Sequence, residues 1–149
     1  SPNTHNNLGD VYGRQGDKQR SLSEFLYAIE LKPNYADAYH NAGNVYRELN
    51  QMDKAIEFYQ KAAEINPYLW QSYQNIAAMY FQNGNYDLAE VNIQKAIAIN
   101  PKNFNLVNNL GIIYLTRGEK EKAKQVFQSI LAQDPNNQVA QAGYSEASK

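Results

Sequence analysis

The chain has 149 residues, a nearly balanced net charge of -1 at pH 7, and no cysteine. Its acidic and basic side chains are interspersed, which argues against a dedicated nucleic-acid surface or a polybasic membrane anchor. The lack of cysteine excludes thiolate nucleophiles, disulfides and thiolate metal sites. No long apolar run is present, so the sequence predicts no membrane-spanning segment.

One pattern recurs along the chain with a fixed period of 34 residues. A period of this length predicts a stack of identical units, in which each unit completes the core of its neighbour. The recurring residues are Pro33, Pro67, Pro101 and Pro135; Tyr12, Tyr46, Tyr80 and Tyr114; Asn7, Asn41, Asn75 and Asn109; and the small residues Gly9, Gly43, Ala77 and Gly111. We therefore expect a single all-α solenoid domain with repeats at 2–35, 36–69, 70–103 and 104–137, followed by a cap at 138–149.

The first repeat predicts a pair of antiparallel helices joined by a tight turn. Its first half has apolar residues spaced i, i+3 and i+4, as an amphipathic helix requires, and ends at Gly16. A second apolar series ends before Pro33, because proline lacks an N–H donor and restricts the residue that precedes it. The residues expected to face the core are Leu8, Val11 and Tyr12 in the first helix and Leu22, Phe25, Leu26 and Ile29 in the second.

The next three repeats keep both apolar series and the closing proline. At the turn of the second repeat, Asn50 stands where the other repeats have glycine. The segment that follows the fourth repeat is too short for another pair of helices, so we expect it to cover the last helix as an end cap. The cap residues expected to pack inward are Val139, Ala140, Ala142 and Tyr144.

A small residue occupies one position in the first helix of every repeat, as Gly9, Gly43, Ala77 or Gly111. Glycine within a helix costs about 1 kcal/mol relative to alanine, so its repeated use requires a packing reason. Close approach of the two helices of each pair supplies that reason. We expect the recurring tyrosine to fill the space that remains between the helices.

These positions carry a resemblance to a known family. The residues Leu8, Gly9, Tyr12, Gly16, Phe25, Ala28 and Pro33, with their counterparts in the later repeats, resemble the tetratricopeptide repeat. The resemblance implies a right-handed superhelix whose concave wall is formed by the first helix of each repeat and usually binds a peptide or a partner's segment. The positions that depart from the family pattern are His5, Ser21, Asn50, Val107 and Ile130.

The resemblance also places a row of asparagines on the concave wall. An asparagine side chain has one acceptor and two donors, so it can pair with both the C=O and the N–H of a bound peptide. The row is similar to the asparagine ladder of superhelical peptide-binding repeats such as those of O-linked N-acetylglucosamine transferases. The alternative is that each asparagine bonds a neighbouring helix or water. The polar residues expected to bind peptide are Asn7, Asn41, Asn75, Asn109, Asn44 and Arg47.

The inward positions of the third and fourth repeats differ in character from those of the first two. They include the apolar residues Ala78, Phe81, Ile112 and Leu115. Apolar residues on a wall that faces water predict a hydrophobic pocket for a partner's side chains. The alternative is that the C-terminal cap or a further repeat covers them.

Two other segments and one ligand class bear on how the chain could bind a partner. The turn at Tyr68, Leu69 and Trp70 either docks a second protein or staples the adjoining helices. The run 119–122 is expected to be a solvated face with helix-supporting charge pairs. Some tetratricopeptide co-chaperones bind acidic chaperone tails through Lys and Arg, but the matching positions here hold residues such as Asn6, so we do not expect that ligand class.

Residues that support catalysis are sparse. His5 and His40 are the only candidate bases near neutral pH, and no Ser, Cys or second His lies at a matching spacing. No phosphate-binding loop or metal-ligand cluster is present. We therefore expect a non-catalytic scaffold that binds a protein or peptide, with no cofactor, no nucleic-acid partner and no membrane insertion.

Two alternative functions stay open at this point. The chain is either the substrate-recognition arm of a larger enzyme, such as a glycosyltransferase, or a scaffold that assembles with further copies of itself. It begins Ser1–Pro2 without an initiator methionine or a signal peptide, which indicates an excised or processed piece. The sequence therefore predicts no compartment beyond a weak preference for the cytoplasm.

Overall fold

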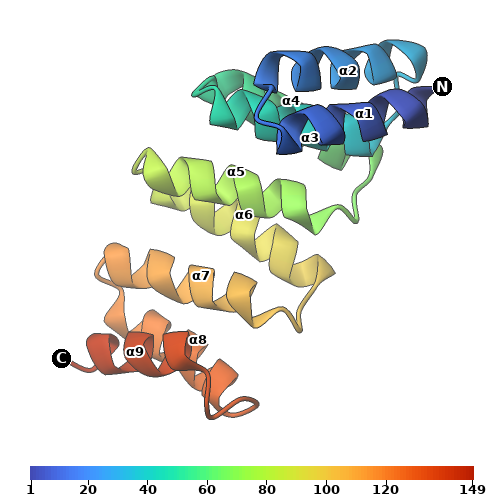
Figure 1. Cartoon of the computed structure of the whole chain (residues 1–149). Coiled ribbons are helices and arrows are strands. Elements are labelled where there is room, and N and C mark those ends of the chain that lie inside the picture. The colour runs from blue at the N-terminus through green and yellow to red at the C-terminus, as the bar shows by residue number, and fades with distance from the viewer. The chain divides into compact units, whose positions relative to one another are not determined.

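A computed structural model of the chain describes all residues, 1 to 149, and contains nine α-helices and no strand (Figure 1). The prediction of an all-α fold is confirmed. The helices are α1 (Pro2–Arg14), α2 (Lys18–Leu31), α3 (Ala36–Glu48), α4 (Met52–Ile65), α5 (Trp70–Gln82), α6 (Tyr86–Ile99), α7 (Phe104–Thr116), α8 (Lys120–Leu131) and α9 (Gln138–Ala147).

The turns within the helix pairs share one backbone conformation. Gly16, Gly84 and Gly118 have φ angles of 80°, 74° and 78°, which is the left-handed region that only glycine enters without steric cost. Asn50 takes the same conformation with φ 57°. Asparagine tolerates this region better than other residues with a side chain, so it replaces glycine at this turn without changing the fold.

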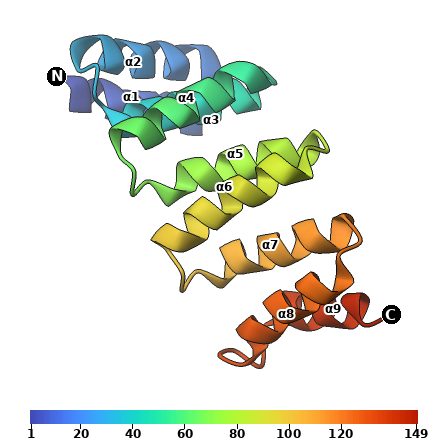
Figure 2. The same ribbon diagram turned by 180° about the vertical axis from the view of Figure 1, so that it is seen from behind.

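The chain forms two compact units, Ser1–Ile76 and Ala77–Lys149. In the first unit, α1 packs on α2 and α3 packs on α4, and α2 also contacts α3. In the second unit, α7 lies against both α6 and α8, and α9 packs on α8 and α7. Figures 1 and 2 show these neighbours within each unit from opposite sides.

The core of the first unit is centred on Phe25 of α2. This ring is 3% exposed and forms a cluster with Ala42 and Val45 of α3. The partly buried residues that surround the cluster are Leu22, Ile29, Leu49 and Phe58. One aromatic ring therefore joins its own helix pair to the next pair along the chain.

The core of the second unit is centred on Phe127 of α8, which is fully buried. Its cluster includes Tyr114 of α7 and two alanines of the cap helix, Ala140 and Ala147. Gly143 of α9 faces the same ring so closely that an added methyl group would overlap it. The cap therefore extends the packing of the repeats onto one more helix.

Some residues that the sequence analysis placed in the core lie outside it. Val139 is 48% exposed and Ala142 is also exposed, because the buried stripe of α9 runs through residues 140, 143, 144 and 147. Leu26 is 37% exposed on the outer side of α2. Val11 is 47% exposed, because no helix of its unit covers that side of α1.

The residue at the small position of each first helix depends on the side chain that faces it: the larger the facing side chain, the smaller the residue. A methyl group built on Gly9 would lie 2.6 Å from Cε1 of Phe25, and one built on Gly43 or Gly111 would lie 2.9 Å from Tyr59 or 2.5 Å from Phe127. In the third repeat the same two positions hold Ala77 and Ile93, both buried. Glycine therefore stands at this position where an aromatic ring occupies the facing position, and alanine stands there where an aliphatic side chain does.

The recurring tyrosines lie at the edge of the core, and three of them are covered by cations. Tyr46 and Tyr114 are buried, whereas Tyr12 and Tyr80 are half-buried. A cation eight residues further along packs over three of the four rings at 5.1 to 5.4 Å from the ring centroid. The pairs are Arg20 over Tyr12, Lys54 over Tyr46 and Lys122 over Tyr114. Such contacts contribute about 0.5–1 kcal/mol each at exposed sites.

The charged run at 119–122 is not entirely solvated. Glu119 is half-buried and pairs with Arg117 at 2.7 Å and also with Lys122. Arg117 further pairs with Asp87 and Glu90 of α6, and Glu90 accepts a 2.7 Å hydrogen bond from the Tyr114 hydroxyl. The sequence period gave no sign of this network, because the positions matching Arg117 hold Gln15, Leu49 and Asn83.

We expect Gly9→Ala to lower the free energy of unfolding by about 1–3 kcal/mol, because the new methyl group displaces Phe25. Combining it with Phe25→Ile, which copies the pair of the third repeat, should cost less than the sum of the two single changes. The measurement is a double-mutant cycle by urea unfolding, where residues in contact couple by about 0.5–3 kcal/mol. Strict additivity would contradict the size matching.

Candidate functional site

The predicted asparagine row differs in environment from repeat to repeat. Asn7 is exposed, whereas Asn41, Asn75 and Asn109 are half-buried. The Asn41 Nδ2 group donates a 3.2 Å hydrogen bond to Oδ1 of the buried Asn6. This bond ties α3 to α1, so the amide of Asn41 has a fixed orientation and keeps one further N–H donor.

A second polar cluster joins three helices of the first unit. Asn44 Oδ1 accepts hydrogen bonds from the Tyr59 hydroxyl at 2.7 Å and from Asn75 Nδ2 at 3.2 Å. Asn75 Oδ1 in turn accepts a 3.3 Å bond from Nη1 of Arg47. Burial raises the pKa of Tyr59 to about 12, so its hydroxyl stays protonated and donates throughout the physiological range. The cluster connects α3, α4 and α5.

Arg47 carries a positive charge that this cluster does not neutralise. Its side chain is half-buried, and no ion pair of the structure includes it. Its hydrogen bond goes to a neutral amide. A guanidinium has five donors, so Arg47 keeps donors available for a carboxylate or a carbonyl.

A contact that the sequence analysis missed joins His40 to a serine. His40 Nδ1 lies 2.8 Å from Oγ of Ser72, although the two residues are 32 positions apart. Spacing along the sequence gave no sign of this pair, because the two residues belong to different repeats. Ser72 is completely buried, so its hydroxyl cannot reach a substrate, and the pair serves to join α3 to α5.

Burial lowers the pKa of His40, and the neighbouring charge of Arg47 lowers it further while Asp37 opposes the shift. The folded protein therefore favours the neutral imidazole. His5, the other histidine, lies 2.7 Å from a carboxylate oxygen of Glu24 and against the edge of Tyr27. Neither histidine lies in a group of three metal-ligating side chains.

The apolar residues predicted to form a pocket lie in the second unit with unequal exposure. Ala78 is exposed and Ile112 is 37% exposed. Phe81 is half-buried with its ring 5.4 Å from that of Tyr86, and Leu115 packs against the Phe127 cluster. Phe81 and Leu115 are thus held by neighbouring side chains, while Ala78 and Ile112 present apolar surface to water.

The fourth repeat has a polar atom without a partner. Asn108 is 3% exposed and donates to Asn137 at 3.2 Å, but its Oδ1 accepts no hydrogen bond. In the first repeat the matching Oδ1, that of Asn6, accepts from Asn41. The position that matches Asn41 is Gly143 in the cap, where the ring of Phe127 leaves no room for a side chain.

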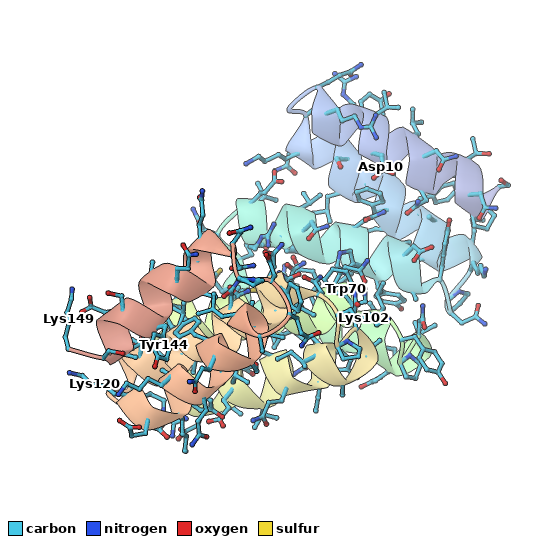
Figure 3. The ribbon with its side chains drawn as sticks, turned by 90° about the horizontal axis from the view of Figure 1, so that it is seen from below. Asp10, Trp70, Lys102, Lys120, Tyr144 and Lys149 are labelled. Carbon is cyan, nitrogen blue, oxygen red and sulfur yellow. The ribbon has the colours of Figure 1, made fainter.

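The residues of the turn before α5 differ in exposure. Tyr68 is 79% exposed and therefore does not staple the adjoining helices, whereas Leu69 and Trp70 are half-buried. Trp70 is the first residue of α5, and Tyr144 packs against the Phe127 cluster. Both residues are labelled in Figure 3, where Lys149 extends from the end of the chain. No helix of the protein combines the length and the apolar character needed to cross a membrane.

We expect acid to destabilise the fold partly through His40. Because its folded pKa lies below the ordinary value of 6.5, its contribution to stability is complete above that pH and is lost as the pH falls toward the folded pKa. His40→Asn, which installs the residue found at this position in the first and fourth repeats, should reduce this loss. Urea unfolding between neutral and acidic pH measures the free energy of unfolding of both proteins. Identical dependence of this free energy on pH in the two proteins would contradict the prediction.

The comparisons with known proteins address the fold. Four family profiles, each described as tetratricopeptide repeat, match residues 2–35, 36–69, 58–91 and 80–146. Comparison with curated protein sequences finds no significant match.

Solved structures share the fold at low sequence identity. A crystal structure of MamA is 22% identical, with a TM-score of 0.84 over 91% of this chain and 79% of that one. A tetratricopeptide repeat protein from Parabacteroides merdae is 23% identical, with a TM-score of 0.82 over 98% of this chain and 57% of that one. Pseudomonas aeruginosa pilF is 20% identical, with a TM-score of 0.81 over 98% and 67%. The matched profiles run from residue 2 to residue 146, and the chain therefore belongs to the tetratricopeptide repeat family.

Proposed function

We propose that the protein is a non-catalytic scaffold that holds a segment of a partner protein against the first helices of its repeats, with residues 1–149 acting as one tetratricopeptide domain of four repeats and a cap. The tetratricopeptide repeat fold is typical of protein-interaction scaffolds. The observation that carries the finer proposal is the oriented polar cluster of Asn44, Asn75 and Arg47, which ends in an unneutralised guanidinium.

Oriented amides favour binding because their conformational freedom is already lost. The Asn41 and Asn75 side chains are fixed by hydrogen bonds to neighbouring helices, and each keeps donor and acceptor capacity for a ligand. Immobilising a free side chain on binding costs about 0.5–1.5 kcal/mol, and this cost is reduced here. The internal bonds therefore support peptide recognition as well as packing between the helices.

The charge of Arg47 selects the chemistry of the segment that binds the first unit. A half-buried guanidinium that bonds only a neutral amide gains most from a carboxylate, because the opposite charge attracts it and the two carboxylate oxygens fit its fork of donors. We therefore assign to this surface a segment with an aspartate or glutamate side chain that bonds Arg47 while its backbone bonds the amides of Asn41 and Asn75.

The second unit offers an apolar surface instead. Hydrogen bonds contribute only about 0.5–1.5 kcal/mol each, so a few amides alone give weak binding. Ala78 and Ile112, with the half-buried Phe81 and Leu115 on the same two helices, would contact apolar side chains of the partner. Asn109, which is half-buried on the same helix as Ile112, supplies a further amide.

We expect the protein to retain acidic peptides on an array of short synthetic peptides graded in net charge. Arg47→Gln should weaken retention of the acidic peptides about tenfold or more, because a charge-assisted bond of about 1.5–3 kcal/mol is lost. The matched control is Lys102→Gln, which removes an exposed charge from a turn of the second unit. Equal losses in the two variants would show a general charge effect and contradict the site.

A second pair of variants tests the apolar surface of the second unit. Ile112→Ser should weaken the retention of peptides with large apolar side chains, whereas Val139→Ser, at a similarly exposed position on the cap helix, should leave it unchanged. Circular dichroism confirms that both variants are folded. Unchanged retention by folded Ile112→Ser would remove this surface from the proposal.

A further inference from the structure

His40 of α3 adjoins the oriented polar cluster of the first unit, although it is not among the residues assigned to the binding surface above. Its ring centroid lies 5.4 Å from that of Tyr59, whose hydroxyl donates to Asn44. His40, Asn44 and Arg47 are spaced i, i+4 and i+7, so they follow one side of α3. The imidazole therefore belongs to the same surface as the unneutralised guanidinium.

The buried hydroxyl of Ser72 decides which nitrogen of this imidazole carries the proton. Ser72 Oγ lies 2.8 Å from His40 Nδ1 and forms no other hydrogen bond, and the residue is 0% exposed. If Nδ1 carried the proton, the serine hydroxyl would have no acceptor, and a buried donor without an acceptor is costly. Ser72 therefore donates to Nδ1, and the neutral imidazole has its proton on Nε2.

The Nε2–H group of His40 is open to solvent. No group of the protein bonds Nε2, and the one buried side-chain oxygen or nitrogen that lacks a partner is Oδ1 of Asn108. Nε2 is therefore not a buried atom, although the histidine as a whole is half-buried. The result is an N–H donor that is held in place from its other side and has no acceptor within the chain.

This pairing of a histidine with a hydroxyl occurs in one repeat. The positions that match His40 hold Asn6, Gln74 and Asn108, and those that match Ser72 hold Thr4, Ala38 and Leu106. Asn6 and Asn108 are buried, and Asn108 spends a donor on Asn137 within the fold. The exposed donor is thus specific to the second repeat and does not follow from the 34-residue period.

We propose that His40 binds the partner segment directly: Ser72 fixes the imidazole in its Nε2–H form, and this N–H donates to a backbone carbonyl oxygen of the segment whose carboxylate bonds Arg47. The inference rests on the proposed function, because it requires a segment bound at Arg47. A helix rises about 1.5 Å per residue, so the two side chains start about 10 Å apart along α3. About three residues of an extended segment span that distance.

The proposed donor supplies orientation, and Arg47 supplies charge. The imidazole is neutral near pH 7, because burial lowers the pKa of His40. Every residue of a segment offers a carbonyl oxygen, so His40 places few demands on the side chains of the ligand. Since Ser72 already holds the ring, little freedom is lost when the bond to the segment forms.

Nitrogen NMR of the full chain at neutral pH tests the tautomer without a ligand. We expect one-bond coupling to hydrogen at Nε2 of His40 and none at Nδ1. His5 is an internal reference with the opposite pattern at Nδ1, because that nitrogen lies 2.7 Å from a carboxylate oxygen of Glu24, which only accepts. A proton on Nδ1 of His40 would overturn the inference.

Titration with the acetylated and amidated peptide Gly-Glu-Gly-Glu-Gly tests the contact. The Nε2–H hydrogen resonance of His40 should shift as the peptide binds. His40→Asn, the residue of the first and fourth repeats, should weaken binding about two- to tenfold, because a neutral hydrogen bond is lost. His40→Gln, the residue of the third repeat, keeps an amide N–H near the place of Nε2 and should bind more tightly than His40→Asn.

Arg47→Gln separates this inference from the proposed function. Weaker binding in Arg47→Gln with unchanged binding in His40→Asn would overturn the role of His40 and leave the proposed function in place. Equal losses in the two His40 variants, with an unmoved Nε2–H resonance, would show that His40 acts through packing and would also overturn it. Unchanged binding in Arg47→Gln would overturn the proposed function and this inference together.

Discussion

The structure depends on the close approach of one side chain of each second helix to one small residue of the first. Phe25, Tyr59 and Phe127 rest directly on glycines, and a methyl group on any of these glycines would overlap the ring. Phe25 also reaches Ala42 and Val45 of the next pair, so a single side chain holds two levels of the stack. Loss of this contact would therefore weaken both a pair and its junction with the following pair.

The 34-residue period was sufficient to predict the helices, the turns and most of the core, because each of these depends on local spacing and on neighbours that repeat. It failed for Val11 and Val139, whose environments depend on which helix happens to lie beside them. It also missed the contact between His40 and Ser72 and the ion pairs of Arg117, because these use residues that differ from one repeat to the next. Periodicity describes what the repeats share, and these contacts arise where they differ.

The same distinction applies to the candidate site. The asparagine positions follow from the repeat, but their hydrogen bonds do not: Asn41 bonds Asn6, whereas Asn75 bonds Asn44. The difference follows from Arg47 and Tyr59, which hold Asn44 and Asn75 in one cluster and have no equivalent pair beside Asn41. The first unit therefore gains a charged, oriented surface from side chains that a consensus repeat would not predict.

The first and the last helix pairs differ in which of their apolar residues are covered. In the last pair, α9 brings Gly143 against Phe127 and buries Ala140 and Ala147, so the last repeat has a covered core at the cost of an unpaired Asn108 oxygen. In the first helix pair, Gln15 and Glu24 stand where the second repeat has Leu49 and Phe58, and Val11, Tyr27 and Leu31 are exposed. The exposure of an apolar residue at a repeated position therefore depends on which helix lies beside it, as it does for Val139 on α9.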